Sequence, residues 1–204
     1  MILLSIIILL MFPMFPGLDN GNPLKSFSEK AAASQMSFSY DYVTNGTVPL
    51  KGQGKVVVQD ASFILLGDGL DVRCDGKSVW TMDSVAKEAV VDAVGSDCSD
   101  YVEYPALLLA SLEENFKEID NEEVVVGDKY MTMIELKPVT SSKLKRLKLF
   151  FRGNIPVAAN ITVKDGTVTH FNIKDLKFGK KTSGDEFVFD PATLDSSWII
   201  TDLR

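Results

Sequence analysis

The chain has 204 residues, of which 46% are hydrophobic and 24% charged, and its formal net charge is −7. This length favours one globular domain, and the composition is ordinary for a globular protein. The negative charge argues against nucleic acid as a partner, because phosphate binding requires clustered Lys and Arg. The basic segment 143–148 is a local exception, and its roughly alternating Leu and Lys or Arg predict a strand with a solvated, charged outer face.

The N-terminal stretch is nearly all apolar. The run over residues 1–14 is ended by Pro13, Pro16 and the polar residues after Gly17. It is shorter than the roughly 20 residues that a transmembrane helix needs. We therefore predict a secretory signal peptide over residues 1–20, with an uncleaved membrane anchor as the alternative.

The rest of the chain, residues 24–204, is predicted to form a single domain. It contains two cysteines, Cys74 and Cys98. In an exported protein such a pair can form a disulfide, and two free thiols are the alternative.

The first predicted element is a helix over residues 24–35. Phe27 and Ala31 lie four apart on one face, and Ser26 with Glu29 fits a capping box. Strict alternation of large apolar and polar side chains then predicts a strand over 36–42, followed by a turn at Asn45-Gly46. Further strands are predicted over 55–58, 62–66, 70–74, 77–82 and 87–94.

A second helix is predicted over residues 105–119. Its stripe consists of Leu108, Leu112 and Phe116, four residues apart. The strands predicted after it cover 123–126, 130–136, 144–151, 157–163, 167–173, the pair Phe187 and Phe189, and 198–201.

The sum is about ten strands with two or three helices. An antiparallel meander with one apolar face needs that face covered, and the helices are too few to cover a flat sheet of this width. The predicted fold is therefore mostly β with some α: an incomplete antiparallel β-barrel, that is, a curled sheet covered by a helical lid.

Catalytic and metal-binding patterns are missing from the sequence. His170 is the sole histidine, and the alternation places it away from the apolar face. No Cys-x-x-Cys motif occurs, and Gly52-Gln53-Gly54 precedes a strand, so we interpret it as a bend or bulge and not as a phosphate loop. We predict no enzymatic activity, no cofactor and no metal.

Two short segments carry a family resemblance. The Asp75-Gly76 turn leads into a strand with Trp80, and Pro105 opens an apolar run with paired leucines. A D-G-x-x-x-W hairpin followed by such a helix resembles the LolA family, the periplasmic carriers of outer-membrane lipoproteins. The resemblance extends from Phe27 to Phe189 and implies an incomplete barrel with a helical lid.

The same resemblance implies a function. A monomeric carrier in the periplasm would take the acyl chains of a lipoprotein from an inner-membrane donor complex and pass them to an outer-membrane acceptor. Two alternatives remain open: a module of the same fold for another lipid or lipopeptide, and a structural or interaction domain of the cell envelope.

A cavity for acyl chains needs large apolar side chains on the inner face of the sheet. Burial of roughly 0.8 kcal/mol per CH₂ binds a long chain without polar recognition. An ordinary packed core is the alternative for the same residues. The predicted cavity residues are Phe38, Tyr40, Phe63, Leu65, Trp80, Met82, Leu108, Leu112, Met133, Phe151 and Phe171.

One part of the family pattern is missing. In the family an Arg next to a Pro, just ahead of a strand Phe, hydrogen-bonds the lid. The matching stretch here runs from Gln59 to Phe63 and has neither Arg nor Pro, although Phe63 is retained. We predict that Gln59 makes the lid contact through a weaker, neutral hydrogen bond.

Overall fold

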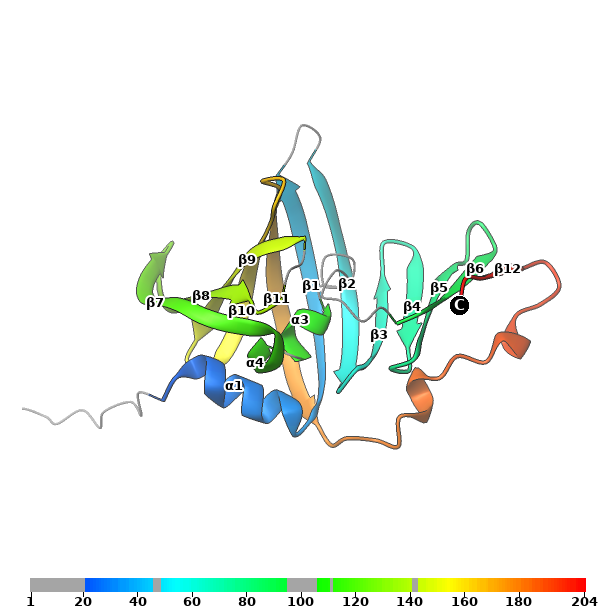
Figure 1. Ribbon diagram of the computed structural model, residues 1–204, viewed down its shortest axis with the longest axis horizontal. Coiled ribbons are helices and arrows are strands. Elements are labelled where there is room, and N and C mark those ends of the chain that lie inside the picture. The colour runs from blue at the N-terminus through cyan, green and yellow to red at the C-terminus, as the bar shows by residue number, and fades with distance from the viewer. Residues whose placement is uncertain (1–20, 46–48, 95–105, 111, 141–142) are drawn as a thin grey trace, which may run out of the picture.

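A single open sheet dominates the computed structural model, which describes residues 21–45, 49–94, 106–110, 112–140 and 143–204. The described part contains twelve strands and three α-helices, and the sheet has two edges, at β7 and β12 (Figure 1). The predicted fold class, a curled and incomplete barrel with a helical lid, is confirmed.

Two meanders make up the sheet, in the order β12-β6-β5-β4-β3-β2-β1-β11-β10-β9-β8-β7. They join where β1 pairs antiparallel with β11, and the last strand, β12, pairs parallel with β6. The strands are β1 (Gln35–Asn45), β2 (Leu50–Gln59), β3 (Ser62–Gly67), β4 (Leu70–Cys74), β5 (Ser78–Asp83), β6 (Glu88–Ala93), β7 (Phe116–Val126), β8 (Lys129–Pro138), β9 (Leu144–Arg152), β10 (Ile155–Val163), β11 (Val168–Gly179) and β12 (Ile199–Asp202).

The first helix, α1 (Pro23–Ala32), starts one residue earlier than predicted and is capped differently. The side chain of Asn22 accepts hydrogen bonds from the backbone N–H groups of Leu24 at 2.9 Å and Lys25 at 3.4 Å. Pro23 occupies the first turn, where its missing N–H costs nothing. The predicted capping box of Ser26 and Glu29 is therefore wrong, because the helix starts earlier.

The second predicted helix is shorter than its apolar stripe suggests. The structure has α3 (Ala106–Ala110) and α4 (Leu112–Asn115), after which β7 begins. Phe116, the last residue of the predicted stripe, pairs with Pro138 of β8. The ladder between the long strands β7 and β8 satisfies backbone groups over their whole length, and this outweighs the helical periodicity.

The inner face of the sheet is the face that the helices cover. α1 contacts β10, α3 contacts β2 and β3, and α4 contacts β7. Leu24, Phe27 and Leu112 join the buried cluster, and the Phe27 ring meets the rings of Phe151 and Phe178 edge-on at centroid distances of 6.2 and 6.0 Å. Each fully buried side chain of this size contributes about 1.5–3 kcal/mol, so apolar contact holds the helices on the sheet.

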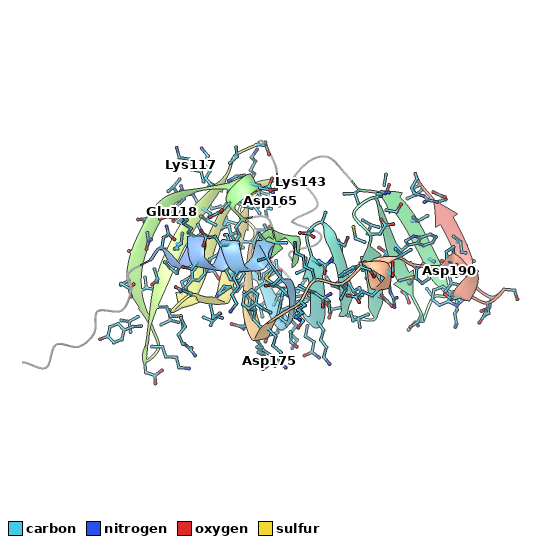
Figure 2. All side chains as sticks on the ribbon, turned by 90° about the horizontal axis from the view of Figure 1, so that it is seen from below. Lys117, Glu118, Lys143, Asp165, Asp175 and Asp190 are labelled. Carbon is cyan, nitrogen blue, oxygen red and sulfur yellow. The ribbon has the colours of Figure 1, made fainter. Side chains whose placement is uncertain are left out.

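The outer face is covered at the β3–β6 end by the C-terminal strap, residues 180–198. In the view from below, the strap runs from the end of β11 to β12, with Asp190 in its second half (Figure 2). Phe187 is 1% exposed, and the Phe189 ring lies 5.1 Å from the Trp80 ring. The predicted strand at these phenylalanines is wrong, since Asp185–Phe187 is a short 3₁₀ turn.

Some predictions fall on residues outside the described ranges. These are the signal peptide, Gly46 of the predicted turn, Pro105 and Cys98, so the Cys74–Cys98 disulfide stays a prediction. Among the described residues, no helix is long and apolar enough to cross a bilayer.

The charged outer face predicted for segment 143–148 is confirmed. Arg146 and Lys148 of β9 both pair with Glu135 of β8, Lys148 at 3.1 Å, while Glu135 is only 5% exposed. Burial raises the pKa of Glu135, but the hydrogen bonds from Lys148 and Arg146 outweigh it and hold the pKa below its usual value.

Replacing this carboxylate should make stability depend less on pH. Because the pKa of folded Glu135 is lowered, its stabilisation is present above the pKa of the unfolded chain, about 4.3, and is lost as the pH falls further. Glu135→Gln should lower the free energy of unfolding by about 1–2 kcal/mol at pH 7 and by much less at pH 3. Urea unfolding at both values measures this, and an equal loss at both would contradict the ion-pair account.

Candidate functional site

The inner face holds a narrow hollow beneath α3, which we call the deep pocket. Its volume is about 30 Å³, enough for about two water molecules. Leu108 and Leu109 of α3 line it and are buried between helix and sheet. The full lining is Phe38, Tyr40, Leu65, Leu108, Leu109, Leu147, Leu149, Ala159, Ile161, Phe171 and Ile173.

A larger hollow, the open groove, continues from the deep pocket. Its volume is about 460 Å³, within the range of small-molecule sites, about 300–1,000 Å³. The two hollows share Tyr40, Leu65, Ile161 and Phe171, and none of the described helix residues lines the groove. Its other lining residues are Tyr42, Thr44, Gly67, Asp68, Leu70, Val72, Val163, Thr167 and Thr169.

Three aromatic rings form the floor of the groove. Tyr40 and Tyr42 alternate along β1, and Tyr42 pairs with Phe171 of β11. The ring centroids lie 6.3 Å apart for Tyr40–Tyr42, 6.0 Å for Tyr40–Phe171 and 5.5 Å for Tyr42–Phe171. These separations are those of favourable aromatic pairs.

Glycines in β2 let the tyrosine rings lie against the sheet. Gly54 stands opposite Tyr40 and Gly52 opposite Tyr42. A Cβ at Gly54 would lie 2.6 Å from the Tyr40 hydroxyl oxygen, and one at Gly52 would lie 2.6 Å from Tyr42 Cε1. The β1–β2 register is continuous here, so the predicted bend or bulge is wrong. The glycines clear space for the rings and so keep the groove open.

The end of the groove farther from α3 carries several polar groups beside the apolar Leu70 and Val163. Asp68 accepts hydrogen bonds from the Tyr42 hydroxyl at 3.2 Å and from the Gln53 backbone N–H at 3.1 Å. The hydroxyls of Thr44 and Thr169 lie 3.0 Å apart. Burial, with the Asp68 charge adding to it, raises the pKa of Tyr40 to about 12, so its hydroxyl stays protonated at neutral pH.

The residues predicted to line a cavity fall into three groups. Five of them, Phe38, Tyr40, Leu65, Leu108 and Phe171, line the deep pocket. Phe63, Leu112 and Phe151 lie in the buried cluster between helices and sheet, with exposures of 0%, 2% and 0%.

The third group lies on the outer face. Cys74 pairs with both Phe63 and Val79, which places Val79 on the inner face and the next residue, Trp80, on the outer one. Trp80 contacts the C-terminal strap through Phe189, and Met82 shares its face. The prediction of an inner-facing Trp80 and Met82 is wrong because the C-terminal strap covers the outer face here, so the apolar set of β5 that contains Trp80 lies on that side while Val79 faces inward.

Met133 also lies on the outer face. It shares that face with Glu135, two residues further along β8, whereas Ile134 pairs with Leu149 of the deep pocket. The strand Tyr-Met-Thr-Met-Ile-Glu-Leu has apolar residues in both alternating sets, so alternation alone could not assign its face.

The predicted lid contact of Gln59 is also wrong. Its side chain accepts a hydrogen bond from the Thr182 N–H at 2.9 Å and donates one to the Thr182 carbonyl at 3.2 Å. Gln59 thus holds the C-terminal strap on the outer face.

Several residues that line the open groove are not among the predicted cavity residues. Tyr42 and Thr169 could have been predicted, because they lie on the same face of β1 and β11 as the predicted residues Tyr40 and Phe171. Alternation could not identify Asp68, because this residue lies in the turn between β3 and β4, where its φ is 53°.

The described residues hold no group of three or more His, Cys, Asp or Glu side chains suited to a metal ion. His170 lies on the exposed outer face between Asn45 and Asn160, as its predicted direction requires.

The model of the family described as outer membrane lipoprotein carrier protein LolA matches residues 69–190. The chain belongs to the LolA family. The predicted family is thereby confirmed, and no curated protein sequence matches the chain.

One solved structure shares the fold, and two others with lower TM-scores bear related family names. An uncharacterised conserved protein from Thermus thermophilus is 10% identical, with a TM-score of 0.54 over 88% of this chain and 96% of that one. A LolA superfamily protein from Nitrosomonas europaea is 11% identical, with a TM-score of 0.48 over 83% of this chain and 99% of that one. A putative outer membrane lipoprotein-sorting domain from Vibrio parahaemolyticus is 12% identical, with a TM-score of 0.45 over 81% and 97%.

The role of α3 can be tested by truncating one leucine. Leu108→Ala should lower the free energy of unfolding by about 2–5 kcal/mol. It should also tighten the binding of an acylated ligand, because less apolar contact must be broken to displace α3. For each 1.4 kcal/mol by which the cost of displacing α3 falls, the dissociation constant should decrease by up to about tenfold. Titration with a fluorescent monoacylglycerol measures the affinity.

The matched control is Leu136→Ala. Leu136 is equally buried, on the inner face of β8, but does not line either hollow. It should destabilise the protein without tightening binding. If Leu108→Ala weakened binding, α3 would be a fixed wall of the site and not a displaceable cover.

Proposed function

We propose that this LolA-family protein is a carrier that binds the acyl chains of lipoproteins in the deep pocket and the open groove. We further propose that it works as a monomer in the periplasm, taking its cargo from an inner-membrane donor complex and passing it to an outer-membrane acceptor. The observation that carries the proposal is the continuity of a small apolar pocket, lined by two leucines of α3, with an open groove of about 460 Å³.

The deep pocket suits an acyl chain because its lining is apolar. The contacts of Leu108 and Leu109 with the sheet are non-directional, so an acyl chain can replace them with contacts of the same kind. Burial then contributes roughly 0.8 kcal/mol for each CH₂. The small volume that α3 leaves free implies that α3 shifts when the chain enters.

Release requires the reverse exchange. A carrier must not hold its cargo so tightly that an acceptor cannot remove it. Because α3 returns its leucines to the pocket when the cargo leaves, the apolar wall is never exposed to water for long. This internal replacement lowers the net affinity for the cargo and keeps the transfer reversible.

A groove-filling variant tests the proposal. Thr169 lies on β11 with its side chain in the groove, and Thr169→Trp should fill part of that space. Binding of a monoacylglycerol with a fluorophore at the end of its acyl chain should weaken by about tenfold or more, a loss of about 1.4 kcal/mol. Fluorescence titration and native mass spectrometry of the purified full chain measure it.

The control places the same side chain on the other face. Val168 is the neighbouring residue of β11 and points to the outer face by alternation. Val168→Trp should bind the probe as the wild type does. If the wild type binds no probe, or if Thr169→Trp binds as tightly as Val168→Trp, the carrier proposal fails.

A further inference from the structure

The open groove differs in polarity between its two ends. Toward α3 it merges with the deep pocket, whose lining is apolar apart from the Tyr40 hydroxyl. At the opposite end its lining includes the polar groups of Tyr42, Thr44, Asp68 and Thr169, beside Leu70 and Val163. A ligand that occupies both hollows is therefore an amphiphile whose polar group lies at the Asp68 end.

Asp68 brings a negative charge to that end. Its carboxylate accepts hydrogen bonds from two neutral donors, the Tyr42 hydroxyl and the Gln53 backbone N–H. Among the described residues no Lys or Arg forms an ion pair with it. The carboxylate thus lines the groove with an unpaired charge that favours a cationic group and repels an anionic one.

Aromatic faces lie beside this charge. Tyr42 is tied to Asp68 by its hydroxyl and stacks on Tyr40, with an interplanar angle of 26°. Gly52 and Gly54 allow both rings to lie against the sheet as part of the floor. Ring faces attract ammonium groups, and a carboxylate at their edge adds to that attraction.

We infer that the polar end of the open groove binds a primary ammonium group on an acylated molecule, with Asp68 as counter-ion and Tyr40 and Tyr42 as the aromatic floor. The inference rests on the proposed function, since the acyl chains of the same molecule occupy the deep pocket. Two sources supply this chemistry: the free α-amino group of a diacylated N-terminal cysteine, and the headgroup of an ethanolamine phospholipid.

Matched pairs of competitors test the inference. Each pair has identical acyl chains and differs only in acetylation of the amine: a dipalmitoyl-glyceryl-cysteinyl peptide with and without N-acetylation, and an ethanolamine phospholipid with and without it. Displacement of the fluorescent monoacylglycerol from the full chain gives the ratio of the two affinities. The free amine should bind about tenfold more tightly in at least one pair, and the pair that shows it identifies the source.

Asp68→Asn should bring that ratio close to one. Asn accepts the positive φ at this position, so the β3–β4 turn is kept. The control is Asp128→Asn, which removes the same charge from the exposed β7–β8 turn and should keep the tenfold ratio. A second variant, Tyr42→Leu, removes one ring face and should reduce the ratio without changing the charge of Asp68.

The possible outcomes separate the two proposals. If all four competitors displace the probe equally from the wild type, or if both Asp68→Asn and Tyr42→Leu keep the preference, the ammonium site is wrong while acyl binding stands. If the wild type binds neither probe nor competitors, both proposals fail. A raised salt concentration should lower the ratio in the wild type but not in Asp68→Asn.

Discussion

The open sheet has an apolar inner face that it cannot bury against itself, and this constraint governs the rest of the structure. A closed barrel would cover such a face by curling completely. Here β7 and β12 remain as edges, and α1, α3 and α4 cover the inner face instead. Their cover is incomplete, because α3 ends over the deep pocket and the floor formed by Tyr40, Tyr42 and Phe171 continues beyond it. The site is the part of the inner face at and beyond the margin of the helical cover.

The outer face meets the same constraint at the other end of the sheet. There β5 and β6 carry apolar residues on both sides, and the C-terminal strap covers the outer one with Phe187 and Phe189. Gln59 fixes the strap through its two hydrogen bonds to Thr182. The helical cover of the inner face and the strap on the outer face are therefore separate, and Gln59, which was predicted to contact the lid, contacts the strap instead.

Much of the fold could be predicted from the sequence, because the alternation of polar and apolar residues shows which face of a strand is exposed to solvent. It worked in β1 and β11, where polar residues separate Phe38, Tyr40 and Tyr42, and it placed His170 correctly on the outer face. It failed for Trp80, because the strap buries the apolar face of β5 on the outer side of the sheet, and for Met133, because β8 has apolar residues on both faces. The second helix was predicted too long because pairing between β7 and β8 is a long-range interaction. The polar groups at the far end of the groove include Asp68, a turn residue. Its contacts with Tyr42 and Gln53 depend on how β1, β2 and β3 pair in the folded protein, which the local sequence does not show.

The central claim is that an acyl chain takes the place of the α3 leucines on the inner face. The most direct measurement is a crystal structure of the protein with a bound diacyl lipopeptide. We expect acyl chains in the deep pocket, against Leu147, Leu149 and Ile161, with Leu108 and Leu109 displaced from their positions in the ligand-free protein. Acyl chains bound elsewhere, with both leucines still seated in the pocket, would contradict it.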